Sequence, residues 1–268
     1  MFPQVLTIAG SDSGGGAGIQ ADLKAMSANG VFALSVITSI TAQNTRHIRA
    51  IYDLPISIIA SQLDAVFEDF EITVVKVGML SSSAIIHTVG TKLTQYGVSR
   101  LIVDPVMVAK SGQPLLQDNA IETLKTQLIP QALLLTPNIH EAQLLANQSI
   151  QTLAEARQAA KAIHRLGCQY VLIKGGHLRE RPATDLLYDG RFFRMYQSEM
   201  VPTTNTHGTG CTYASAIAAH LARGKPLPEA IEAAKAYITQ TLRHAIPIGH
   251  GQGPVNHFYF LTTDSPTS

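Results

Sequence analysis

Short apolar runs alternate with amphipathic stretches along most of the 268-residue chain. The apolar runs are rich in Val, Ile and Leu, a pattern typical of strands buried on both faces of a parallel sheet. The stretches between them repeat apolar residues at helical spacing and stop at Gly, Pro or Asn, which predicts helices. The predicted strands cover residues 5–9, 31–38, 73–77, 101–103, 132–135 and 170–173. The predicted helices cover residues 19–29, 55–70, 84–96, 119–128, 138–147, 152–166, 212–222 and 227–245.

This alternation predicts an α/β fold in which helices cover both faces of a mainly parallel sheet. Asp189-Gly190 is a strong turn signal between segments 185–188 and 191–195, so we expect an antiparallel hairpin there. The turn-rich residues 249–258 are expected to pack as a loop, and the end from Thr262 to fray. Because no repeat or linker interrupts the pattern, we expect one domain over residues 1–268, with its core at about 5–258.

Charge is almost balanced, with 20 Lys and Arg against 19 Asp and Glu. This balance gives no electrostatic reason to expect a nucleic acid or a membrane surface as a partner. Residues 1–5 lack the features of a signal peptide, and no apolar run approaches membrane-spanning length, so we expect a cytoplasmic location. Cys168 and Cys211 are too few for a disulfide framework or a Cys-based zinc site, so each is expected to be a free thiol.

Residues 205–212, Asn-Thr-His-Gly-Thr-Gly-Cys-Thr, place glycines and hydroxyl groups where a predicted helix begins. A helix N-terminus offers unpaired backbone N–H groups and the positive end of the helix dipole, so Gly208, Thr209 and Gly210 are candidates for an anion hole. Cys211 would lie in the first turn, where the same field favours a thiolate. We therefore expect a base beside a bound phosphate, with a glycine-rich cap over a small buried cysteine as the alternative.

Two further segments follow the first two predicted strands. Residues 10–18 form a glycine-rich loop whose backbone can approach a ligand closely, and they match neither the P-loop nor the dinucleotide-binding pattern. Residues 39–45 are expected to form a polar loop at the carboxyl end of the second strand, where open parallel sheets bind ligands. Gln43 in that loop offers both a donor and an acceptor for the edge of a heterocycle. The alternatives are a flexible turn and a solvated glutamine.

Three charged residues lie at or just beyond later strand ends. Asp104 closes one strand, and Glu141 lies just past another, in the first turn of a predicted helix. Carboxylates in such positions can hold Mg²⁺ directly or through water, although a first-turn glutamate is also favoured by the helix dipole alone. Lys174 ends a further strand and is a candidate for contact with a nucleotide phosphate, or is simply solvated.

Seven motifs occur in a characteristic order along the chain. They cover residues 9–22, 41–45, 78–80, 104–106, 136–138 with Glu141, 174–177 and 206–212. Together they resemble the hydroxymethylpyrimidine/phosphomethylpyrimidine kinases of thiamine biosynthesis, over about residues 5–258. Each motif alone would be a weak signal, whereas the ordered set is specific.

The resemblance implies a ribokinase-like fold and two ATP-dependent phosphorylations, first of the hydroxymethyl group of the pyrimidine and then of the resulting monophosphate. It also implies a requirement for Mg²⁺ and a homodimer. By the family pattern Gln43 reads the edge of the pyrimidine. The residues that this pattern places around the ring are Gly10, Ala17, Asp22, Met79 and Val106.

The same resemblance assigns the phosphate side of the site. Asp104 and Glu141 would serve the Mg²⁺ and phosphate network, and Lys174 would contact the nucleotide. Cys211 stands where the wider ribokinase-like group usually has aspartate as the base for the attacking hydroxyl. The backbone N–H groups of Gly208, Thr209 and Gly210 would stabilise the transferred phosphoryl group.

Three other functions compete with this assignment. Pyridoxal or pyridoxine kinase is the closest alternative, because that substrate is also a flat nitrogen heterocycle with a hydroxymethyl group. A cysteine hydrolase using Cys211 and His207 would need an orienting third residue, and no accompanying pattern supplies one. A non-catalytic pyrimidine-binding module on the same fold is the third possibility, since fold does not determine function.

Overall fold

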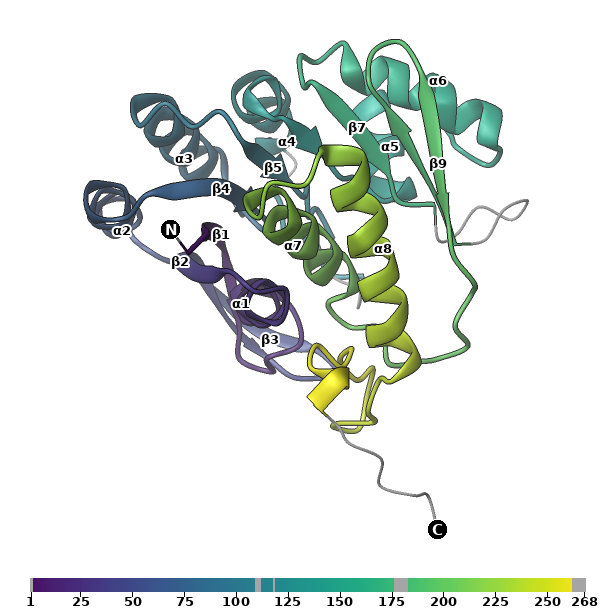
Figure 1. Ribbon diagram of the computed structural model, residues 1–268. Helices are drawn as coiled ribbons and strands as arrows, with labels where there is room; N and C mark the ends of the chain where they lie inside the picture. Colours follow the sequence, from purple (N-terminus) through teal and green to yellow (C-terminus); the bar gives the residue numbers. More distant parts are fainter. Residues whose placement is uncertain (1, 109–111, 118, 176–182, 262–268) are drawn as a thin grey trace.

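The computed structural model describes residues 2–108, 112–117, 119–175 and 183–261, which are built around a nine-stranded sheet (Figure 1). The strands are β1 (Gln4–Asp12), β2 (Phe32–Gln43), β3 (Ile48–Asp53), β4 (Ile72–Val77), β5 (Leu101–Val103), β6 (Leu134–Leu135), β7 (Tyr170–Ile173), β8 (Thr184–Tyr188) and β9 (Phe193–Gln197). The helices are α1 (Gly18–Ala28), α2 (Ile56–Asp69), α3 (Ser83–Gln95), α4 (Ala120–Thr123), α5 (Ile139–Ala146), α6 (Leu153–His164), α7 (Thr209–Ala222) and α8 (Leu227–Arg243). Shorter helical turns cover Leu124–Leu128, Ile129–Gln131 and Tyr259–Leu261.

The strand order is β3-β2-β1-β4-β5-β6-β7-β8-β9. Neighbouring strands from β2 to β7 run parallel, whereas β3 at one edge and β8 and β9 at the other pair antiparallel. The predicted α/β class with a mainly parallel sheet is therefore confirmed. The chain leaves β1 toward β2 and β3 and returns to β4 on the other side of β1, so the carboxyl end of β1 is a topological switch point, where such sheets bind ligands.

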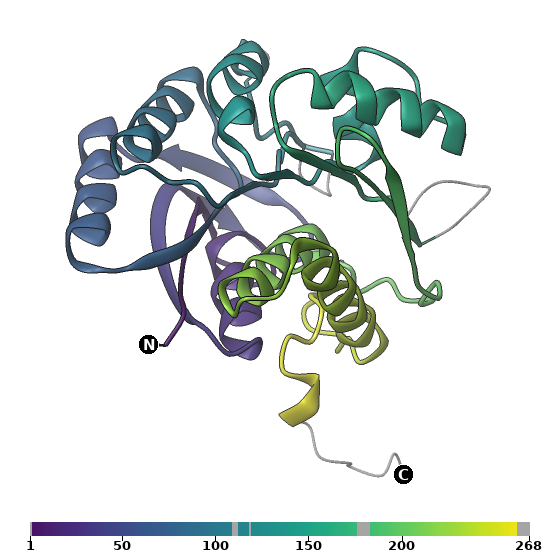
Figure 2. The ribbon, with the colours of Figure 1, turned by 45° about the horizontal axis from the view of Figure 1, so that its top comes forward.

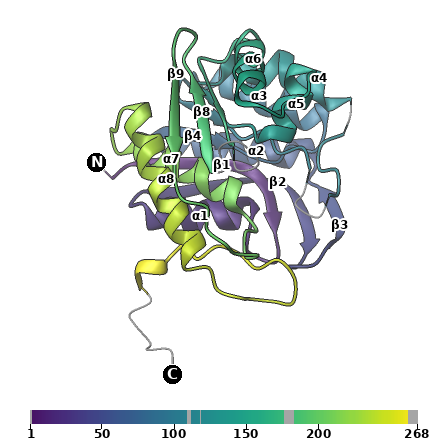
Figure 3. The same ribbon diagram turned by 90° about the vertical axis from the view of Figure 1, so that its right-hand side faces the viewer.

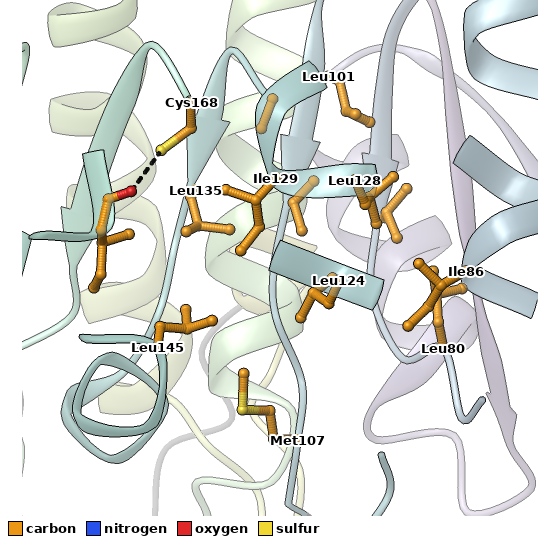
Figure 4. Close-up of a cluster of buried hydrophobic side chains, with 14 of the residues drawn as sticks. Leu80, Ile86, Leu101, Met107, Leu124, Leu128, Ile129, Leu135, Leu145 and Cys168 are labelled. Carbon is orange, nitrogen blue, oxygen red and sulfur yellow. Dashed lines mark hydrogen bonds between the residues drawn. The ribbon is translucent and has the colours of Figure 1, made fainter. Parts of the chain in front are cut away.

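Successive side chains of the central strands point to opposite helical layers. In β1, Leu6 and Ile8 belong to the core that includes side chains of α2 to α6, whereas Val5 belongs to the core that includes side chains of α1, α7 and α8. Figure 2 shows these two layers on either side of the sheet, and Figure 4 shows the first core, where Ile129 and Leu135 meet. Burial on both faces explains why the strands are continuous apolar runs in the sequence.

The end of β2 differs from the prediction. We expected a strand ending at Thr38 and a loop over residues 39–45, whereas β2 continues to Gln43 and the chain turns back as β3. Antiparallel pairing, with Ile40 opposite Tyr52, stabilises the extension. Since polar and apolar residues alternate at this sheet edge, no continuous apolar run marks it as a strand.

The helix predicted over residues 119–128 is in the right place but has a different form. Only α4 is α-helical, and the chain continues as a π-helical turn over Leu124–Leu128. Pro130 follows this turn and has no N–H group to continue α-helical hydrogen bonding. The remaining predicted elements are confirmed, with ends that differ by three residues or fewer.

Two expectations concern residues that the structure does not describe, and the expected single domain is not tested by it. The frayed end predicted from Thr262, and Gly176 and His177 of the motif 174–177, lie outside the described residues. That the chain forms one domain stays a prediction, which the continuity of the sheet supports. Within the described ranges, no helix combines the length and the apolar character needed to cross a bilayer.

Candidate active site

The carboxylate of Asp12, at the end of β1, holds the glycine-rich loop in place. Its Oδ1 accepts a hydrogen bond from the Gly14 N–H at 2.8 Å, and its Oδ2 accepts one from the Ala17 N–H at 2.8 Å. Burial alone would raise the pKa of Asp12, but the hydrogen bonds from His207 and from these backbone N–H groups outweigh it and lower the pKa. The loop is therefore organised around a buried carboxylate rather than being a flexible turn.

This loop packs directly against the start of α7. Gly208 is the residue before the helix and has a φ of +78°, which favours glycine. A Cβ at Gly208 would overlap the carbonyl oxygen of Gly16, so a side chain cannot be accommodated there. The helix begins at Thr209, three residues earlier than predicted, and Cys211 lies in its first turn as expected.

The chain beyond α8 closes one side of the same region. The Gln252 N–H donates to the Thr45 carbonyl oxygen at 2.9 Å, and the Gly251 N–H donates to Thr45 Oγ1 at 3.1 Å. The Gly253 carbonyl oxygen accepts from the His207 N–H at 3.1 Å. Figure 3 shows this segment passing below the ends of β1 and β2. As predicted, residues 249–258 form a loop rather than a helix.

Several residues predicted to surround a heterocycle lie close together at this edge of the sheet. Gly10 of β1 lies next to Met79, since a Cβ built on Gly10 would lie 3.0 Å from the sulfur of Met79. Gln43 exchanges backbone hydrogen bonds with the Ser13 hydroxyl at 2.7 and 2.8 Å. Its side-chain Nε2 lies 3.3 Å from Nε2 of His207. The extension of β2 thus brings Gln43 beside the glycine-rich loop.

Asp22 is also near this edge, but it lies fully buried in α1. Its two oxygens accept hydrogen bonds from Lys76 Nζ at 2.9 and 3.0 Å, from the Thr7 hydroxyl at 2.6 Å and from the Ser215 hydroxyl at 2.7 Å. Direct contact between Asp22 and a ring stays a prediction. The geometry shows Asp22 joining α1 to β1, β4 and α7.

Lys76 was not among the residues selected from the sequence. It is fully buried in β4, where burial would lower its pKa but the Asp22 carboxylate, followed by Cys211 and Asp104, raises it. A charged residue inside the apolar run 73–77 was the available signal, because a buried ammonium needs a charged partner. That partner is 54 positions away in sequence, so the run alone could not identify it.

The phosphate side of the site forms where α7 begins. Gly210 faces two predicted site residues, since a Cβ built on it would lie 3.4 Å from Lys174 Nζ and 3.8 Å from Asp104 Oδ2. Lys174 Nζ donates to Asp104 Oδ1 at 2.6 Å, and the Thr136 hydroxyl donates to the same oxygen at 3.0 Å. The structure therefore brings together the anion-hole residues, the strand-end carboxylate and the predicted nucleotide lysine.

Glu141 belongs to the same charged group and also caps its own helix. Its Oε2 accepts from the Asn138 N–H at 2.8 Å, while Asn138 Oδ1 accepts from the Glu141 N–H at 2.9 Å, a complete capping box. Burial raises the pKa of Glu141 to about 7, with Lys174 lowering it and Asp104 raising it further. Glu141 therefore caps α5 and also interacts electrostatically with Lys174 and Asp104.

The surroundings of Cys211 oppose the expected thiolate. Burial raises the pKa of Cys211 to about 11; Lys76 opposes this rise, while Asp22 and Asp104 add to it. Burial and the two carboxylates thus act against the helix dipole on which the expectation relied. The thiolate stays a prediction, and a pKa of about 11 favours the thiol form at neutral pH.

The protonation of Cys211 can be tested by alkylation. In a Cys168→Ala variant, the rate of reaction with iodoacetamide should keep rising about tenfold per pH unit from pH 7 to 10, because the thiolate is the reactive form. Mass spectrometry of the Cys211 peptide measures the rate. A plateau already reached at pH 8 would show that the site lowers the thiol pKa after all.

Known proteins similar to this chain share both its sequence and its fold. The profile of a family described as phosphomethylpyrimidine kinase matches residues 12–256. The hydroxymethylpyrimidine/phosphomethylpyrimidine kinase of Rhizobium meliloti is 50% identical over 257 residues, which cover 95% of this chain and 96% of that protein. The thiamine biosynthesis bifunctional protein ThiED of Geobacter sulfurreducens is 52% identical over 258 residues, but this chain spans only 53% of its length.

Among solved structures, an ADP complex of Bacillus subtilis pyridoxal kinase superposes with a TM-score of 0.91 at 36% identity, covering 98% of this chain and 100% of that chain. This similarity agrees with the ribokinase-like three-layer fold expected from the motifs. Sequence identity is higher toward the pyrimidine kinases than toward this pyridoxal kinase. From the profile match, which spans most of its length, and from these relatives, the chain belongs to the phosphomethylpyrimidine kinase family.

Proposed function

We propose that this chain phosphorylates 4-amino-5-hydroxymethyl-2-methylpyrimidine with ATP, and then phosphorylates the resulting monophosphate to the diphosphate, in thiamine biosynthesis. One observation carries the proposal beyond family membership. At Gly210 the start of α7 meets Lys174 and Asp104, and at Gly208 it packs against Gly16 and Ala17 of the glycine-rich loop. A phosphoryl group and its acceptor can therefore be held in adjacent positions.

The ring half of the site suits a flat heterocycle. Gly10 and Ala17 present little side chain, and Met79 supplies a polarisable thioether beside them. The Gln43 amide has one donor group and one acceptor, which match a ring nitrogen and an exocyclic amino group on one edge of a pyrimidine. In this structure its Oε1 accepts from the Thr41 hydroxyl at 3.0 Å and its Nε2 lies 3.3 Å from His207 Nε2, so a bound ring would exchange these contacts for its own. Val106, half-buried three residues beyond β5, would complete the apolar wall.

The phosphate half provides positive electrostatic potential without a P-loop. Backbone N–H groups of Gly208, Thr209 and Gly210 lie at the N-terminus of α7, where they would stabilise charge on the transferred phosphoryl group. The Thr209 N–H donates to the Thr206 carbonyl oxygen at 3.3 Å in this structure and would exchange that bond for the phosphoryl group. The Lys174 ammonium adds a full positive charge and is presently held by Asp104 at 2.6 Å. We assign Lys174 to the nucleotide phosphates.

Asp104 and Glu141 are suited to a magnesium-nucleotide complex. Mg²⁺ usually binds through one or two carboxylates together with waters and substrate phosphates, and these two residues would supply the carboxylates. Asp104 also raises the pKa of Glu141, so both carboxylates lie in one electrostatic field. When bound, Mg²⁺ would neutralise charge on the nucleotide phosphates.

Cys211 is proposed to accept the hydroxyl proton in the first phosphorylation. That step requires removal of a proton from an alcohol, whereas the nucleophile of the second step is a phosphate oxygen already largely ionised at neutral pH. Since the pKa of Cys211 is about 11, only a small fraction is thiolate at pH 7, and this fraction rises with pH. If Cys211 is the base, the first phosphorylation therefore depends on it and the second does not.

Cys211→Ala should accordingly slow the first phosphorylation by about 100-fold, in the range of a lost general base, and the second by much less. In the unmodified enzyme, kcat/KM of the first step should rise with pH above 7, and this rise should be absent from the variant. Coupled assays with each substrate separately measure both. Equal losses in the two steps would leave Cys211 as a positioning residue.

Phosphorus NMR of the purified protein with ATP, Mg²⁺ and the pyrimidine tests the overall function. We expect the pyrimidine monophosphate to appear first and the diphosphate to follow. A parallel sample with pyridoxal tests the second candidate, which the close superposition on a pyridoxal kinase favours. Phosphorylation of pyridoxal alone would overturn the proposal, and no ATP consumption with either substrate would favour the non-catalytic alternative.

A homodimer is proposed through the outer face of β2 and β3. Ile40 and Tyr52 are directly opposite each other on these strands and are 47% and 65% exposed. The next opposing pair on the same face, Ala42 and Ala50, is also exposed and apolar. Such a face at a sheet edge favours pairing with a second copy, as the family resemblance implies.

Light scattering after size exclusion should therefore give twice the chain mass for the unmodified protein. Tyr52→Lys combined with Ile40→Lys should convert it to a monomer, because two charges would be buried at the interface. Phe192→Lys, at a site that is 74% exposed in the turn between β8 and β9, is the matched control and should leave the dimer intact. A monomeric unmodified protein at micromolar concentration would contradict the assignment.

A further inference from the structure

A third buried ion pair, in addition to Lys76–Asp22 and Lys174–Asp104, joins Asp185 and Lys235. Asp185 in β8 is 2% exposed, and its Oδ2 accepts a hydrogen bond from Lys235 Nζ of α8 at 2.7 Å. Its other oxygen, Oδ1, accepts from the backbone N–H of Gly175 at 3.1 Å. One carboxylate thus connects a helix, a strand and the residue that follows Lys174.

The contact with Gly175 fixes the backbone from which Lys174 projects. The Lys174 N–H donates to the Pro137 carbonyl oxygen at 2.8 Å, and the next N–H along the chain, that of Gly175, donates to Asp185. Both peptide groups that flank the Cα atom of Lys174 are therefore held by hydrogen bonds. The side chain then reaches Asp104 Oδ1 at 2.6 Å, beside the start of α7.

The same ion pair also contacts the anion-hole helix. Lys235 Nζ lies 5.8 Å from the centre of the Tyr213 ring, within the range of a cation–π interaction. Tyr213 is two residues beyond Cys211 in α7 and is 4% exposed. The pair therefore touches both structures that meet at Gly210, the strand end carrying Lys174 and the first turns of α7.

We propose that Asp185 and Lys235 are positioning residues for the nucleotide, which act by holding the Lys174–Gly175 backbone at a fixed place relative to α7. The inference rests on the proposed function, in which Lys174 contacts the nucleotide phosphates. Burying a charged pair gains little stability compared with apolar packing, so a purely structural purpose explains it poorly. The hydrogen bonds of Asp185 reach Lys235 and the backbone beside Lys174, not the residues assigned to the ring, so we expect the effect of the pair to fall on ATP.

Lys235→Met removes the cation and leaves Asp185 without its charged partner. We expect the KM for ATP to rise about tenfold, the size expected when a hydrogen-bonded charge is lost, while the KM for the pyrimidine stays within about twofold. Calorimetric titration with a non-hydrolysable ATP analogue should show the same loss in affinity. Lys235→Arg keeps the charge and should restore most of the ATP affinity, and Asp185→Asn should resemble Lys235→Met.

The ion pair between Asp64 of α2 and Lys92 of α3 is a matched control. Its Nζ to oxygen distance is 2.6 Å, and it joins two helices on the opposite layer of the sheet. Lys92→Met should change thermal stability without changing either KM. If Lys235→Met likewise lowers only the melting temperature and the fraction of active enzyme, with an unchanged KM for ATP, the positioning role is wrong.

Failure of the two proposals can be told apart in the unmodified enzyme. Absence of ATP binding or turnover before any substitution would contradict the proposed function itself. A fully active kinase whose ATP affinity is indifferent to Lys235→Met and Asp185→Asn would contradict only the inference about the pair. A rise in both KM values would also overturn it, since that result would indicate general distortion of the site.

Discussion

The buried carboxylate of Asp22 is the interaction on which the rest of the site depends. It joins Thr7 of β1, Lys76 of β4 and Ser215 of α7 to its own helix α1. The glycine-rich loop, Met79 and Cys211 extend from the ends of these same elements. A buried ammonium or a buried carboxylate is costly without its partner, so separating Lys76 from Asp22 would leave an uncompensated buried charge. This cost holds the four elements in one relative arrangement.

Two of the buried cations in this region are each paired with a carboxylate. Lys76 is matched by Asp22, and Lys174 by Asp104. Burial raises the pKa of Glu141 to about 7, with Lys174 lowering it and Asp104 raising it further. The paired charges largely cancel, which leaves the helix terminus as a source of positive potential at this end of the sheet.

Local pattern predicted most of the fold, because strands buried on both faces and amphipathic helices have clear periodicities. It failed at β3, where an edge strand such as Ile48–Asp53 mixes polar and apolar residues and depends on its pairing with β2. Candidate site residues were found through glycine loops, strand ends and the family motifs. Lys76 and Asp185 were not, since their charged partners are distant in sequence. The pKa of Cys211 depends in the same way on burial, Asp22 and Asp104, which a local motif does not show.

The hydrogen bonds that join Thr45 and His207 to residues 251–253 have a consequence for how the enzyme is made. All nine strands of the described sheet precede this segment in the chain, so every strand is synthesised before residues 251–253 can reach Thr45 and His207. The end of β2 and the start of α7 are therefore joined through this segment only after α8 has been made.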